Sequence, residues 1–174
     1  MSSTLVLTSF KKIGGIQTIL DLDASLKTIE FVSNWCLEDG DYCAQVIEEM
    51  ADKMIEIFGK LNQNTFEQVL PCYFRFVELS NEIAEKFVYN GDFIKYLVKN
   101  LGFLDGTYKH RHPNIIFIAL QILMYLLPKH KNPREIFEEH NLYPTIVNIL
   151  HEAKFEDLVV LEEIASCLLQ VYSK

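Results

Sequence analysis

Apolar side chains recur at intervals of three and four residues along most of this chain of 174 residues. The clearest stretch, residues 65–80, places on one stripe Phe66, Val69, Leu70, Tyr73, Phe74 and Val77. That spacing is typical of one face of an amphipathic α-helix. Pro71 interrupts the stripe and predicts a kink, or a break between two shorter helices, because proline removes a hydrogen-bond donor.

Two further segments show the same spacing. One carries Val46, Met50, Met54, Ile57 and Phe58, and the other carries Leu158, Leu161, Ile164, Leu168 and Val171. No run of strand length alternates clearly between apolar and polar residues. The pattern therefore predicts an all-α fold.

Four short stretches also repeat one order of apolar and polar positions. They cover residues 16–23, 51–58, 94–101 and 143–150, and their starts lie 35, 43 and 49 residues apart. A second series of apolar helices has ends 44, 48 and 45 residues apart, at Trp35, Leu79, Leu127 and Tyr172. Two interleaved series with a common period of about 45 residues predict stacked units of two or three helices.

The motifs of these stretches resemble the armadillo repeat family. GGIQTILDL (residues 14–22) and LYPTIVNIL (residues 142–150) are similar to its third-helix motif Gly-Ile-Pro-x-Leu-Val-x-Leu-Leu, with Pro144 at the proline position. Val32 to Trp35 resembles the end of the long second helix, whereas Gly91 precedes its expected place by two residues. The resemblance implies a single domain, residues 1–174, folded as a right-handed α-solenoid of about four armadillo-like repeats; HEAT repeats are the nearest alternative.

The same resemblance implies a binding groove, because the motif-bearing helices of an armadillo stack line its concave side. The implied partner-binding residues on those helices are Thr18, Asp21, Asp52, Lys53, Glu56, Lys95, Tyr96, Lys99, Thr145 and Asn148. The alternative is that these residues form only the solvated side of each helix. Tyr96 is either a binding hot spot or a residue packed between repeats.

The charge of the groove changes along the predicted stack. Its polar positions are acidic at Asp21 and Glu56 and basic at Lys99. A ligand with a basic and an acidic end is therefore expected, with the polarity setting its orientation more than its affinity.

Two groups within the armadillo family define the possible partners. Importin-like adaptors hold basic peptides with repeated tryptophan and asparagine residues. This chain has one tryptophan, Trp35, outside the motif helices, so recognition of such peptides is disfavoured. Short nucleotide-exchange factors of the seventy-kilodalton heat-shock chaperones have about four repeats, and FKKIGGIQTIL (residues 10–20) is similar to an early one. We expect an adaptor or scaffold that binds another protein or peptide, with such an exchange factor as the alternative.

The distribution of charge along the chain suggests a further alternative, contact with an anion or with RNA. The formal net charge of −8 disfavours general nucleic-acid binding, because phosphate contacts need a basic face. Residues 89–136 are nevertheless net +4, and the loop 107–113 holds Lys109, His110, Arg111 and His112. This loop is a candidate contact for an anion, RNA or the ribosome, or else a solvated loop.

The sequence shows no catalytic constellation. The adjacent carboxylates Glu162 and Glu163 would diverge by about 100° on a helix. The phosphate-binding motifs GxxxxGK[ST] and GxGxxG do not occur, and His110 and His112 lack further ligands for a metal ion. We therefore expect a protein that is not an enzyme and that needs no cofactor or metal.

Cysteine usage and hydropathy bear on localisation. The four cysteines, Cys36, Cys43, Cys72 and Cys167, form no CxxC pair and favour reduced thiols in the cytoplasm, with the nucleus possible. The longest apolar run, residues 115–127, is shorter than the about 20 residues that a bilayer span needs, so no membrane association is expected.

Apolar residues near both chain ends predict that at least one end of the stack is covered by a partner or by self-association. These residues are Leu5, Val6, Leu7 and Phe10 at one end, and Leu168, Leu169, Val171 and Tyr172 at the other.

Overall fold

The computed structural model describes the backbone of residues 14–22 and 25–173. Within these ranges the chain is almost entirely helical and contains no strand, which confirms the predicted all-α fold. Its eleven described α-helices are α2 (Gly15–Leu22), α3 (Leu26–Glu38), α4 (Gly40–Glu49), α5 (Ala51–Lys60), α6 (Gln63–Glu78), α7 (Asn81–Tyr89), α8 (Gly91–Leu101), α9 (Pro113–Leu126), α10 (Pro133–Glu139), α11 (Leu142–Phe155) and α12 (Val159–Tyr172).

The helices from α4 onward form three successive triplets. The first triplet comprises α4, α5 and α6, the second α7, α8 and α9, and the third α10, α11 and α12. Each triplet ends in a long helix, and α3 precedes the first triplet as a further helix of this kind. The long helices α3, α6, α9 and α12 pack in sequence, each on the next.

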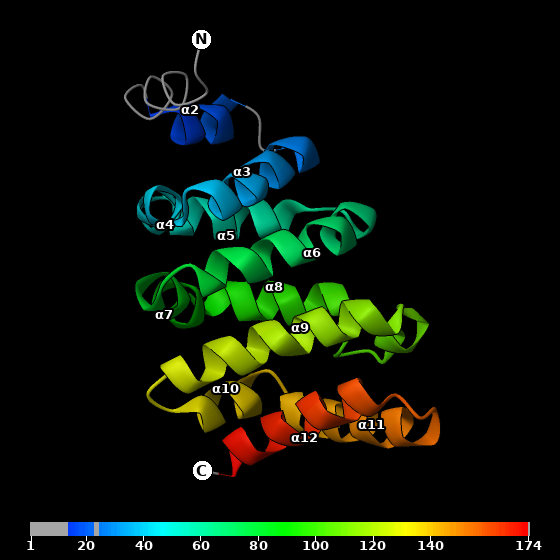
Figure 1. The fold of residues 1–174 in the computed structure, drawn as a ribbon. Coiled ribbons are helices and arrows are strands. Elements are labelled where there is room, and N and C mark those ends of the chain that lie inside the picture. The colour runs from blue at the N-terminus through cyan, green and yellow to red at the C-terminus, as the bar shows by residue number, and fades with distance from the viewer. Residues whose placement is uncertain (1–13, 23–24, 174) are drawn as a thin grey trace.

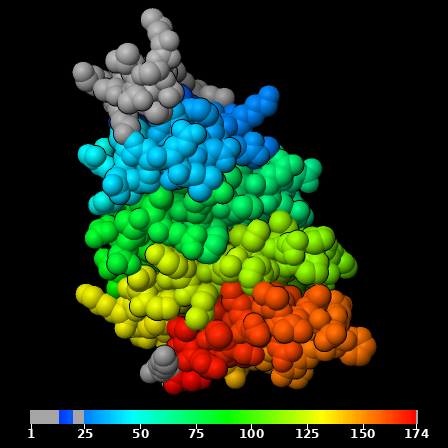
Figure 2. Space-filling model, in the orientation of Figure 1, coloured from blue at the N-terminus to red at the C-terminus, as the bar shows by residue number. Residues whose placement is uncertain are grey.

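The triplets follow one another from the N-terminal to the C-terminal end of the molecule (Figure 1). In the space-filling view the colours succeed one another in bands, so that segments close in sequence are also neighbours in space (Figure 2). Helix α5 packs on α8 and α4 on α7, which extends the contact between the first two triplets across three pairs of helices. This layered arrangement agrees with the repeating pattern of the sequence.

Polar caps set several helix boundaries. The side chains of Ser25, Asn62 and Ser80 each accept a hydrogen bond from a backbone N–H in the first turn of α3, α6 and α7. Such caps satisfy donors that have no partner within the helix. The predicted break at Pro71 is wrong, since α6 is one helix from Gln63 to Glu78. Buried side chains on both sides of Pro71 hold this helix in place by tertiary packing.

The first and second triplets share an aromatic core. Phe58 lies at its centre, with ring centroids 5.3 Å from Phe66, 4.5 Å from Tyr73 and 4.8 Å from Phe93. All four side chains are fully buried. The Tyr73 hydroxyl donates a hydrogen bond to the backbone carbonyl of Met54 at 2.7 Å, and burial raises its pKa well above the ordinary value.

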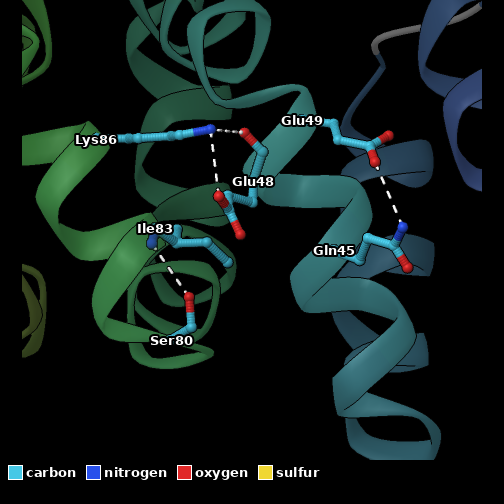
Figure 3. A network of polar contacts seen from close by, with 6 residues as sticks. All are labelled: Gln45, Glu48, Glu49, Ser80, Ile83 and Lys86. Carbon is cyan, nitrogen blue, oxygen red and sulfur yellow. Dashed lines mark hydrogen bonds and ion pairs between the residues drawn. The ribbon is translucent and has the colours of Figure 1, made fainter.

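Polar contacts also join successive units. Lys86 of α7 donates to the backbone carbonyl of Glu48 at the end of α4, at 2.9 Å, and lies 3.5 Å from its carboxylate (Figure 3). Asn90 donates to the Asp52 carboxylate at 3.1 Å, again across 38 residues. Both contacts join the first triplet to the second.

The C-terminal apolar residues are partly used by the chain itself. Leu168 is fully buried, and Leu169, Val171 and Tyr172 pack half-buried against the core. The N-terminal set, Leu5, Val6, Leu7 and Phe10, lies outside the described residues. Every helix in the described parts of the chain is too short or too polar to cross a bilayer.

Candidate functional site

Helix α9 presents an apolar stripe outside the core. No charged residue occurs between Pro113 and Leu126, so the helix is apolar on all sides. Its partly exposed side chains are Ile115, Phe117, Ile118, Gln121, Met124 and Tyr125. A helix that is apolar all round is ordinarily buried, so a stripe left half-exposed marks a surface available for contact.

Two hollows lie between α9 and α12. One, of about 390 Å³, lies where both helices begin and is lined by Phe117, Leu158 and Val160 among others. The second, of about 260 Å³, lies one turn further along and is lined by Phe74, Gln121, Met124, Tyr125 and Ile164. Phe117 to Gln121 and Val160 to Ile164 are single helical turns, so the two hollows follow one another along α9 and α12, and together they are named the α9–α12 groove.

The beginning of this groove is lined by strongly exposed apolar side chains. Val159 and Val160, in the first turn of α12, are 55% and 59% exposed. Burying a large apolar side chain contributes about 1.5–3 kcal/mol, so a partner that covers both would gain substantially.

The charges beside the groove are mainly acidic. Asp157 lines the first hollow, Glu163 precedes Ile164 on α12, and Glu78 lies one turn after Phe74 on α6. All three are exposed, and no cation of the described residues forms an ion pair with them. Partial burial raises the pKa of Glu78, and Arg75 opposes that shift. Arg75 itself donates to the backbone carbonyl and hydroxyl of Ser33, at 2.9 and 2.8 Å.

Several predicted partner-binding residues have partners within the chain. Thr145 is only 6% exposed, and its hydroxyl donates to the carbonyl of Phe103 at 3.2 Å, so it is not accessible to a ligand here. Tyr96 is half-buried against Gly59, where a Cβ atom would come within 2.4 Å of its ring. The contacts of Tyr96 therefore support packing between units rather than exposure in a groove.

The other predicted residues lie at or near the surface. Glu56 pairs with Lys60 and Lys95 with Asp92, whereas the exposed side chains include Thr18, Lys99 and Asn148. Lys53 is half-buried, and the side chain of Asp21 lies outside the described residues. None of the ten lines either hollow of the α9–α12 groove, and their role in binding stays a prediction.

The basic loop is largely paired within the molecule. Lys109 forms an ion pair with Glu152, and Arg111, whose side chain is 8% exposed, pairs with Glu67. Arg111 also donates to the carbonyl of Asn100 at 2.8 Å. His112 caps α9 by accepting from a backbone N–H, which leaves His110 as the exposed residue without a structural task in this loop. Little uncompensated positive charge therefore remains here for a phosphate.

The thiols differ in accessibility. Cys36, Cys43 and Cys72 are buried, whereas Cys167, on α12, is exposed. A hydrogen bond with Cys43 lowers the pKa of Cys36, and burial raises the pKa of Cys72. No group of three or more potential ligands among the described residues is placed to hold a metal ion.

Comparison of the chain with protein-family models, with curated proteins and with solved structures gave no match. The class of protein therefore has to be argued from the stacked helical triplets and from the α9–α12 groove.

Proposed function

We propose that this chain is a protein-interaction module, a right-handed α-solenoid of armadillo-like repeats that binds a partner protein through the face of its long helices. Three successive helical triplets, joined by contacts between equivalent positions, support the architecture. A stack of this kind presents an extended surface made from successive units, which suits it to contact another macromolecule.

The α9–α12 groove is the observation that carries the proposal. Single exposed apolar side chains are normal, but a contiguous apolar patch on a protein surface marks an interaction site. Here the exposed Val159 and Val160 line the first of two mainly apolar hollows along α9 and α12. The side chains that line the groove are mainly apolar. Apolar side chains can bury surface against a partner but cannot transfer protons, so the site suits binding better than catalysis.

The experiment compares proteins captured by the intact chain and by two charge variants. Val160→Asp places a carboxylate in the groove, and Leu37→Asp is the matched control, since Leu37 is a 70% exposed apolar residue on α3. We expect the partners of the intact chain to be lost with Val160→Asp and retained with Leu37→Asp. Circular dichroism checks that both variants remain folded, and capture of the same proteins by both would overturn the proposal.

A further inference from the structure

We propose that the α9–α12 groove receives an amphipathic α-helix of the partner protein, with basic residues beside the apolar stripe of that helix. The inference rests on the proposed function, because it names the chemistry of a ligand for the same face. Three properties carry it, namely the small number of hydrogen-bonding side chains on the walls, the spacing of the side chains and the sign of the flanking charge.

The walls offer few partners to an extended peptide backbone. Of the thirteen residues that line the two hollows, four have polar side chains, Asn114, Gln121, Tyr125 and Asp157. An extended ligand would bury N–H and C=O groups against Phe74, Met124 and Ile164, and unpaired buried groups of this kind are costly. A helix satisfies its own backbone and can bury an apolar face without such partners.

The side chains of the groove have helical spacing on both walls. Phe117, Gln121 and Met124 follow one another at intervals of four and three along α9. Val160, Ile164 and Cys167 do the same along α12. Two such rows form a channel into which the ridge of a third helix can pack, over a length of about 21 Å for about 14 residues. The flexible Met124 lets the floor adjust to different side chains.

The flanking charge selects the sign of the ligand. The exposed carboxylate of Asp157 lines the first hollow, exposed Glu78 and Glu163 lie near the lining residues Phe74 and Ile164 in the chain, and α9 contributes no charge of its own. Arg75 is already bonded to Ser33, and Lys129 donates to Asn81 at 2.6 Å while lying over the Tyr125 ring. Lysine or arginine beside the apolar stripe of the ligand would therefore meet carboxylates, whereas acidic residues would be repelled.

A peptide selection tests the inference without assuming its answer. A display library of peptides of about 14 residues, randomised at every position, is selected on the intact chain. The enriched peptides are then measured against Val160→Asp and Ile164→Asp, with Leu37→Asp as the control. Two groove variants are needed because Ile164 is half-buried and its substitution can unfold the chain, whereas Val160 is 59% exposed.

We expect the enriched peptides to be helical, with apolar residues at positions i, i+4 and i+7 and lysine or arginine beside them. Exchanging those basic residues for glutamate should weaken binding about tenfold, the combined effect of several exposed charge pairs. Bound peptide should also slow alkylation of Cys167, which is exposed one turn beyond Ile164 on α12. Protection of Cys167 ties the binding to this groove.

The contrary results separate the two proposals. Enriched peptides that are acidic, rich in proline or extended, and that still fail to bind Val160→Asp, would overturn the helix inference and leave the groove as the docking site. Peptides that bind Val160→Asp as well as the intact chain would overturn the groove itself, and with it the proposed function.

Discussion

Long helices pack on one another both where the first triplet meets the second and where the second meets the third. The side chains at these two junctions differ. At the first, Phe58, Phe66, Tyr73 and Phe93 form a core that is fully buried. At the second, α9 packs on α12, while the large apolar side chains of Phe117, Met124 and Ile164 remain half-exposed along the groove.

The difference shows how one architecture serves two purposes. Bulky aromatic residues between two units consume the apolar surface and contribute to stability. The larger side chains of α9 and α12 that stay half-exposed at the second junction keep apolar surface for a ligand. We therefore expect changes at the first junction to affect mainly the free energy of unfolding, and changes at the groove to affect mainly binding.

The largest effect is expected from Phe58→Ala. Removing a ring from the centre of the aromatic core should lower the free energy of unfolding by about 3–5 kcal/mol, because the lost contacts leave a cavity. Val160→Ala, at the exposed start of the groove, should change it by less than about 0.5 kcal/mol. Urea unfolding of both variants measures the contrast, and equal losses would show that the two junctions do not differ in kind.

The two ion pairs of the basic loop sharpen the same comparison. Arg111, nearly buried, joins the loop to Glu67 at the first junction, and Lys109, more than half-exposed, pairs with Glu152 at the second. Arg111→Met should lower the free energy of unfolding by about 1–3 kcal/mol, because the Glu67 carboxylate and the Asn100 carbonyl lose a charged donor. Lys109→Met should leave stability unchanged within error, and a larger loss there than at Arg111 would contradict the assignment.

A smaller effect is expected where α5 and α8 approach each other. Gly59→Ala places a Cβ atom on the Tyr96 ring, and the overlap should outweigh the gain in helix propensity, for a net loss of about 1–2 kcal/mol. In a Tyr96→Ala background the same change should become stabilising by up to about 1 kcal/mol. A double-mutant cycle in urea tests this, and stabilisation in both backgrounds would show that Tyr96 does not pack between units.

The helical fold could be predicted because amphipathic stripes record burial directly. Phe66, Val69, Leu70 and Tyr73 are buried as their spacing predicts. Pro71 shows the limit of local propensity, since packing on both sides of it keeps α6 continuous.

The candidate site was not predictable in the same way. Phe74, Leu158 and Ile164 belong to the apolar stripes and yet line the groove, because periodicity shows which face is apolar but not whether anything covers it. Thr145 shows the converse, a polar residue whose hydroxyl is buried against Phe103. The feature of the sequence that could have indicated the site is the segment that forms α9, which contains no charged residue over fourteen residues and so has no solvated face.

The smallest effect concerns His140, where the third triplet meets α7 and α8. His140 lies beside a hollow of about 150 Å³ lined also by Val88, Ile94 and Ile136. Burial lowers its pKa from the ordinary value of 6.5, an effect that Glu139 opposes and Lys95 reinforces. A histidine whose pKa is depressed by folding binds more protons in the unfolded chain, so its presence reduces stability as the pH falls below 6.5.

The free energy of unfolding of His140→Gln should therefore fall less than that of the intact chain as the pH is lowered from about 7.5 to about 5.5. Urea unfolding across this range measures the difference, and an NMR titration of the His140 ring checks the direction of the shift. A ring that titrates above 6.5, with parallel stability profiles for the two proteins, would contradict the burial of His140 beside this hollow.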